Sequence, residues 1–272
     1  MLAVASAVSL NAGDYYSGGK APIQAKAPIH AKAPIVEDCI DYGANISAGY
    51  KTDYILHGLR VNGDSVWTDV NYQFDSFLPI TFGVSHVSGI RNTFPYGGIG
   101  PIDETDLYLR AAVGEFAGFA VALSYTHRFL NFSNAQAMNG SYGDVGVDVR
   151  KSLGFVDFVA GSTLGINSRN SFFNAGGGDG WVHRAGLEKE ISLCEQATLI
   201  MSGGVGYHDG YFFNVAGTDD WSHYYLNASI PFELNCRTTI TPYIGYQGVQ
   251  QWGVFFPQGD LLHGGVSLNV SF

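Results

Sequence analysis

From residue 45 onward, apolar and polar side chains alternate along the sequence, mostly in segments of about 11–13 residues. In the segment 65–74, Val66, Thr68, Val70, Tyr72 and Phe74 share one face, and mostly polar residues share the other. Only a β-strand separates such sets cleanly. Similar segments follow at 104–114, 118–129, 141–151, 155–167, 196–208, 221–232 and 238–248. Soluble strands usually have ~5–6 residues, whereas ~9–11 are needed to cross a bilayer.

The connections between these segments alternate strictly between long and short. Short connections lie near Asp75–Pro79, Glu115–Gly118, Ser152–Gly154, Leu193–Gln196 and Glu233–Arg237, and long ones lie at 58–63, 91–103, 130–140, 168–180, 209–219 and 250–259. Transmembrane barrels have short periplasmic turns and longer external loops. We therefore predict an all-β fold: a single transmembrane antiparallel up-and-down β-barrel over residues 45–272, with both termini periplasmic. It has about 12 strands, with 10 or 14 as alternatives.

Composition supports a closed sheet that meets lipid. Only 14% of residues are charged, and the chain contains 36 Gly, 18 Phe and 16 Tyr. A soluble β-sandwich would carry more charge on its outward face. Nowhere do 18 apolar residues follow one another, so a transmembrane helix is excluded. The net charge of −10 argues against nucleic acid as a partner, because phosphate binding needs a basic surface.

The N-terminal segment differs from the rest of the chain. Residues 1–12 resemble a remnant of a secretory signal, with Ala5-Ser6-Ala7 as the cleavage site, although a basic region is missing. Residues 13–44 contain Lys-Ala-Pro-Ile three times, at Lys20, Lys26 and Lys32. Because proline disfavours helix and sheet, this stretch is predicted to be an extended periplasmic linker. A sharper hypothesis is that its lysines dock on an acidic partner or enter the lumen.

The last strand carries a family resemblance. Val266, Leu268, Val270 and the terminal Phe272 share its apolar face. The segment Gly265–Phe272 resembles the C-terminal β-signal of bacterial outer-membrane barrels, which implies recognition by the barrel-assembly machinery. It also implies an integral location in the bacterial outer membrane, with lipid around the barrel and the N-terminal segment in the periplasm. The stretch Gly49–Gly58 resembles the first strand of some outer-membrane families.

Charged residues of both signs fall on the predicted inner face. The pore-lining candidates are Lys51, Asp53, Asp69, Asp106, Arg110, Arg128, Asp148, Arg150, Arg184 and Glu188. They can form a selectivity field inside a narrow pore or structural ion pairs that fill the interior. A lumen of twelve strands can be open or plugged.

A second repeat joins two long loops at a constant offset of 40 residues. Its aromatic members are Phe172, Phe173, Trp181, Phe212, Phe213 and Trp221, and a shorter version has Phe255 and Phe256. These rings can form a platform for a flat ligand, or they can pack loops together and form an interface belt. The repeat also raises a conflict, because carrying the orientation of His223 back by 40 residues would point Arg184 and Glu188 at lipid.

Other chemistry has little support in the sequence. Cys194 and Cys236 are disulfide candidates in two short turns, and an intermolecular bond through Cys39 is the alternative. No spacing selects a catalytic trio or a metal site, so we expect no enzyme, metal or cofactor. The predicted function is that of a porin or channel for passive diffusion of small polar solutes. Such a chain can also form a homo-oligomer. The alternative is a closed structural or adhesive barrel that binds partners through its loops or its N-terminal spacer.

Overall fold

The computed structural model describes residues 42–74, 77–91, 101–134, 139–167, 179–211, 220–249 and 259–272. The signal-like segment and the Lys-Ala-Pro-Ile repeat lie outside these ranges. Among the described residues, no helix is long and apolar enough to cross a membrane.

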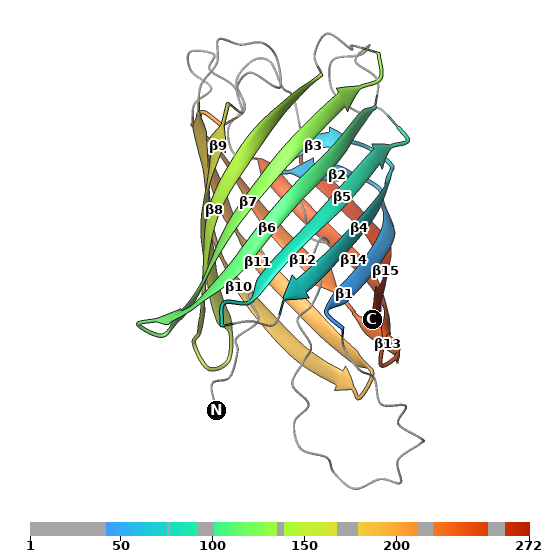
Figure 1. The fold of residues 1–272 in the computed structure, drawn as a ribbon, viewed down its shortest axis with the longest axis vertical. Helices are drawn as coiled ribbons and strands as arrows, with labels where there is room; N and C mark the ends of the chain where they lie inside the picture. Colours follow the sequence, from blue (N-terminus) through green and yellow to red (C-terminus); the bar gives the residue numbers. More distant parts are fainter. Residues whose placement is uncertain are drawn as a thin grey trace, which may run out of the picture.

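Twelve long strands form one antiparallel sheet that closes on itself (Figure 1). The first strand pairs on one side with the second long strand. On its other side it pairs with the last strand, from the pair Asn45–Ser271 to the pair Lys51–Gly265, and this closes the barrel. The wall consists of β1 (Ala44–Lys51), β4 (Ser65–Phe74), β5 (Ile80–Gly89), β6 (Ile102–Phe116), β7 (Phe119–Phe132), β8 (Gly140–Ser152), β9 (Asp157–Ile166), β10 (Gly180–Cys194), β11 (Ala197–Asp209), β12 (Asp220–Ser229) with β13 (Phe232–Asn235), β14 (Thr238–Val249) and β15 (Leu261–Ser271).

Two of the short segments are halves of one transmembrane strand. Both β12 and β13 pair with β11 on one side and with β14 on the other. They are separated at Pro231, which has no backbone N–H to donate to a ladder. The wall therefore has twelve strands, and the predicted all-β, up-and-down barrel is confirmed.

The alternation of turn lengths is also confirmed, with one correction. Short turns join β4–β5, β6–β7, β8–β9, β10–β11 and β13–β14, and the strand ends that the long connections join lie at the other end of the barrel (Figure 1). We predicted an external loop at 58–63, and this prediction is wrong. The first long connection forms the hairpin β2 (Tyr54–Leu56) and β3 (Leu59–Asn62), which lies inside the barrel. Of the stretch Gly49–Gly58, which resembles a first strand, only the residues up to Lys51 belong to the wall.

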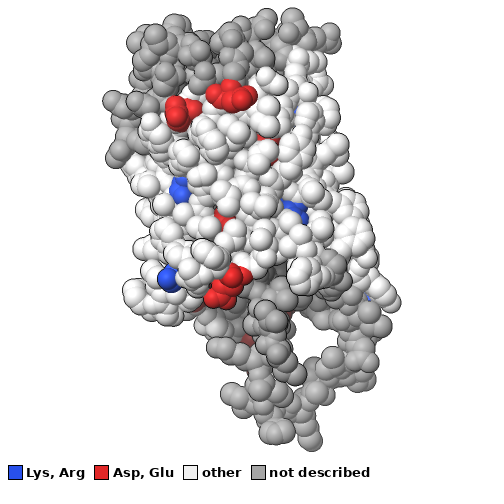
Figure 2. Space-filling model, turned by 60° about the vertical axis from the view of Figure 1, so that its left-hand side comes forward, with Lys and Arg blue, Asp and Glu red and all other residues white. Residues whose placement is uncertain are grey.

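The outer face of the barrel is apolar. Val70, Val205 and Leu226 are between 53% and 59% exposed, although each lies in the middle of a long strand. Figure 2 shows how sparse charged residues are on one face of the molecule. Aromatic side chains face outward near the short-turn ends, including Phe74, Phe82, Phe232 and Phe272. Such a belt suits a lipid environment, where aromatic rings favour the interface.

The apolar face of the last strand points outward, away from the lumen. Val266, Leu268 and Phe272 are each about two-fifths exposed, while Ser267 between them is buried on the inner face. Val270 shares the outward face, because it pairs directly with the outward Ile46 of β1. The residues that resemble an assembly signal therefore form part of the lipid-facing surface, at the seam where the barrel closes.

Candidate functional site

The inner face carries the charged residues that the alternation assigned to it. The structure places all ten pore-lining candidates on the inner side of the wall or on the hairpin inside it, and six of them are less than 9% exposed in the wall strands: Lys51, Asp69, Asp106, Arg128, Arg184 and Glu188. Asp53 is buried just before β2, whereas Arg110, Asp148 and Arg150 are half-buried.

Arg128 is the centre of the largest charge cluster. Its Nη1 donates to Glu104 at 2.6 Å and to Asp106 at 2.8 Å, both on β6. Its Nε donates to Asp144 of β8 at 2.7 Å, and the Arg128 side chain is only 1% exposed. A buried guanidinium needs such partners, since an unpaired charge away from water is very costly. Glu104 was missing from our candidates, although it lies two residues before Asp106 and therefore on the same face.

A second set of ion pairs ties three neighbouring strands together. Arg184 of β10 donates to Asp148 of β8, and Arg150 of β8 donates to Asp157 at 2.6 Å and to Glu188 at 2.8 Å. Cations and carboxylates therefore alternate along one wall, from β6 to β10. In these ion pairs three arginines face six carboxylates, so the wall keeps an excess of negative charge.

The hairpin β2–β3 forms around a two-residue turn. His57 and Gly58 have φ values of 46° and 82°, as the tight turns of β-hairpins require, and glycine adopts this conformation without strain. The hairpin side chains Tyr54, Leu56, Leu59 and Val61 are at most 1% exposed. An X-Gly pair between two short segments with apolar residues is the sequence signal of a hairpin, and we interpreted this stretch as a strand followed by a loop.

Paired polar contacts fix the base of the hairpin to the wall. Asn62 donates to the backbone oxygen of Ile102 at 2.6 Å, and the amide of Ile102 donates back to Asn62 at 2.9 Å. Arg60 pairs with Asp53 across the hairpin, and the ammonium of Lys51 lies 4.4 Å from the centre of the Tyr54 ring. These contacts hold the base of the hairpin. Its turn is held by a separate set of contacts.

The tip of the hairpin sits among the side chains of four wall strands. His208 Nε2 of β11 donates to the backbone oxygen of His57 at 2.6 Å, and the amide of Gln247 on β14 donates to the oxygen of Gly58. The His57 ring packs edge-on against Tyr211, with centroids 4.8 Å apart. We call His57 and Gly58 the tip. The seat consists of the residues around them: Asp144, His208, Tyr211, His223 and Gln247.

The seat connects the hairpin to the charge cluster. Tyr211, which follows β11, donates its hydroxyl to Asp144 at 2.5 Å. The Nε2 of His57 lies 3.8 Å from the other oxygen of Asp144, which also accepts from Arg128. His223 of β12 covers the other side of the tip, because its ring lies against Gly58. A change of charge at any of these groups therefore reaches the hairpin directly.

Acidification is expected to release the tip. Burial lowers the pKa of His57, although Asp144 acts in the opposite direction. The seated form is thus the neutral ring, and seating loses stability as the pH falls below the ~6.5 of a free histidine. Arg128 and Arg184 also disfavour a positive charge there.

Hydrogen exchange of the amides of 54–62 measures this release. Corrected for the intrinsic rate, exchange should be faster at about pH 5 than at about pH 7.5. His57→Gln should remove most of this difference, because the ring can then no longer gain a proton. An unchanged pH dependence in the variant would assign the effect to other groups.

The second repeat has different orientations in its two copies. His223 is buried on the inner face, but His183 faces outward, where its ring stacks between Trp181 and Tyr207. The strands β10 and β12 are therefore out of phase by one residue, which allows Arg184 and Glu188 to point inward. Trp181 is 41% exposed on the lipid side. The other aromatic candidates, Phe172, Phe173, Phe212, Phe213, Phe255, Phe256 and the side chain of Trp221, lie outside what the structure describes.

One Ser–His contact lies on the outer face. Ser162 Oγ is 2.8 Å from Nδ1 of His183. Aromatic rings cover both faces of that imidazole, so we interpret the pair as part of an interfacial aromatic belt. In the described part of the chain, no group of three or more His, Cys, Asp or Glu side chains could hold a metal ion.

The candidate pair Cys194 and Cys236 does not form a disulfide. Cys194 is a free, exposed thiol, whereas Cys236 is disulfide-bonded. The two cysteines lie in different short turns, β10–β11 and β13–β14, so a bond between them would require the turns to lean together. The third cysteine, Cys39, lies outside the described residues.

Known proteins resemble this chain in fold rather than in sequence. No family model and no curated protein matches it. Among solved structures, the COG4313 outer membrane channel from Pseudomonas putida F1 has a TM-score of 0.57 at 13% identity, covering 88% of this chain and 99% of that one. The KdgM porin in complex with disordered oligogalacturonate (TM-score 0.49, 8% identity, 84% and 99% covered) and the NanC porin (0.49, 12%, 84% and 98%) are also similar.

The likeness to the COG4313 channel and the closed apolar-faced sheet define the class of the fold. It is the bacterial outer-membrane β-barrel, with twelve strands.

Proposed function

We propose that this chain is an outer-membrane channel for the passive diffusion of small polar solutes, with the β2–β3 hairpin as its constriction. The observation that carries the proposal is the inner surface, which combines a charged wall from β6 to β10 with a loop folded into the barrel. Charged side chains that line a narrow barrel select what passes it. The likeness to a solved outer membrane channel supports the same function.

The pairing of the charges favours solutes of low net charge. Arg128, Arg150 and Arg184 each contact at least one carboxylate of the same wall. Because these three arginines face six carboxylates, the wall disfavours anions, and its interleaved signs offer many hydrogen-bond donors and acceptors. Small polar molecules such as sugars or zwitterions fit this chemistry.

A closed structural barrel is the second candidate, and one observation favours it. The hairpin residues Tyr54, Leu56 and Val61 are completely buried, as are Ile102 and Phe132 of the wall at the same end. An apolar cluster of this kind can seal the lumen. External loops or the N-terminal spacer would then carry the function by binding a partner.

Single-channel recording in planar bilayers separates the two candidates. We expect discrete current steps from the protein, and larger steps from a variant in which a short Gly-Ser link replaces residues 54–62. The same link inserted at Gly154, in a short turn at the opposite end, should leave the step size unchanged. If both the protein and the hairpin deletion are silent although they fold, as heat-modifiable migration on gels shows, the channel proposal is wrong.

The same proposal includes the environment of the chain. It places the short turns and residues 13–44 in the periplasm, with outer-membrane lipid around the strands. The barrel-assembly machinery would bind the last strand through Val266, Leu268, Val270 and Phe272, and the outward position of this face supports that role. A homo-oligomer is compatible with this arrangement, and no enzymatic activity is part of it.

A further inference from the structure

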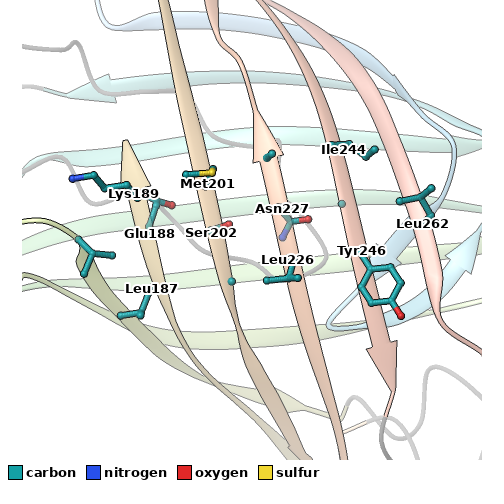
Figure 3. A pocket seen from close by; sticks show the side chains of 14 residues that line it. Leu187, Glu188, Lys189, Met201, Ser202, Leu226, Asn227, Ile244, Tyr246 and Leu262 are labelled. Atoms are coloured by element: carbon teal, nitrogen blue, oxygen red, sulfur yellow. The ribbon is translucent and has the colours of Figure 1, made fainter. Parts of the chain in front are cut away.

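A groove of about 470 Å³ crosses the outer wall of the barrel (Figure 3). It follows two neighbouring cross-strand rows on β10, β11, β12, β14 and β15. One row is Leu187–Gly203–Leu226–Tyr246–Leu262, and the other is Lys189–Met201–Ala228–Ile244–Gly264. Directly paired residues share a face, so both rows point away from the lumen.

Two small residues lie in the central part of the groove. Gly203 and Ala228 lie in adjacent rows between the larger side chains of Met201, Leu226 and Ile244. An added Cβ at Gly203 would meet only a side-chain carbon of Leu226 and a backbone oxygen, and the former lies at 2.8 Å. The lining of the groove is therefore mostly hydrocarbon.

A cation stands at one end of the groove. Lys189 faces outward beside Met201, and its ammonium donates to the backbone oxygen of Phe155 in the β8–β9 turn. Val156 of the same short turn also lines the groove. A lysine facing lipid costs ~2–4 kcal/mol at the bilayer midplane but little near the interface, so Lys189 extends toward the rim. In the described barrel strands, the outward-facing Lys and Arg side chains are Lys151 and Lys189.

The groove runs obliquely across the wall, from that cation toward the long-loop side. Its far end, at Leu262 and Tyr246, lies close to the long-loop ends of β15 and β14, whereas Lys189 lies nearer to the short turns. Four strand spacings give a length of about 19 Å, and a strand tilt of about 40° makes the rise roughly 12 Å. One leaflet of the hydrocarbon core is about 15 Å thick.

We propose that this groove is a binding site for one phospholipid of the leaflet on the short-turn side. The phosphate of the lipid pairs with the Lys189 ammonium, and one acyl chain lies along the groove over Gly203 and Ala228. The groove matches an acyl chain that extends from a head group into the bilayer. The match lies in its length, its direction, its apolar lining and the position of Lys189. The site is separate from the lumen, so it does not depend on the proposed channel.

Native mass spectrometry of the detergent-purified protein with added phosphatidylglycerol tests the site. We expect one lipid to be retained more tightly than any further ones. Lys189→Gln should weaken this binding about fivefold, the usual contribution of one lysine near a lipid phosphate. Lys151→Gln is the matched control: it removes an outward lysine from the same end of the wall but outside the groove, and it should have no effect.

A second variant tests the groove without changing charge. Ala228→Leu fills it and should weaken retention of the lipid, while Ala48→Leu, also on the outer face but outside the groove, should not. Equal lipid retention by all four variants and the unchanged protein would overturn the proposal. A dimer that Ala228→Leu dissociates, with unchanged lipid retention, would also overturn it and would make this face an interface between two copies.

Discussion

Replacing Arg128 by methionine is expected to lower the free energy of unfolding of the barrel by about 3–5 kcal/mol. The guanidinium is 1% exposed and lies between three carboxylates, from Glu104, Asp106 and Asp144. Without it, these carboxylates repel one another in a site that water does not reach, and nothing else in the cluster supplies a guanidinium. Urea unfolding in lipid vesicles, followed by tryptophan fluorescence, measures the loss.

Arg150→Met is the matched control for this prediction. Arg150 also pairs with two carboxylates of the same wall, but its side chain is 21% exposed and solvent can replace part of its interactions. We expect less than half of the effect of Arg128→Met. Adding Asp144→Asn to Arg128→Met should restore part of the stability, because it removes one of the repelling charges. Equal effects of the two single variants would contradict a central role of Arg128.

Substituting alanine for Gly58 is expected to unseat the hairpin tip and to increase the conductance of the barrel. Gly58 has a φ of 82°, where an L-residue is strained, and an added Cβ would lie 2.7 Å from the His223 ring. Because the His223 ring is buried and packs against His208, the tip has to move. Faster hydrogen exchange of 54–62 and longer or larger openings in single-channel recordings are the expected results.

Gly118→Ala provides a control with the same backbone strain. Its φ is 77°, but an added Cβ would meet nothing closer than the end of the Lys151 side chain, at 3.7 Å. Strain alone costs about 1 kcal/mol at each position. Gly118→Ala should therefore leave both hydrogen exchange of the hairpin and conductance unchanged. If Gly58→Ala changes exchange but not conductance, the hairpin is mobile without being the constriction.

The sequence was sufficient to predict the wall. Alternation within each strand is a local property, so it assigned Val66 and Val70 to lipid and Asp69 to the lumen without knowledge of any partner. The lengths of the connections then gave the strand count and the up-and-down order. Even Glu104, which we overlooked, follows from the alternation of its own strand.

Only the tertiary structure decided how the lumen is filled. The hairpin at 54–62 has an apolar pattern that also fits an ordinary strand and loop, and it is buried because Asp144, His208 and Gln247 meet its tip from distant parts of the chain. The same holds for the partners of Arg128 and for the opposite orientations of His183 and His223. Period-two patterning determines the face on which a side chain lies, because it depends on neighbours along the chain. Which groups meet across the barrel depends on register and closure, which arise only when all twelve strands pair.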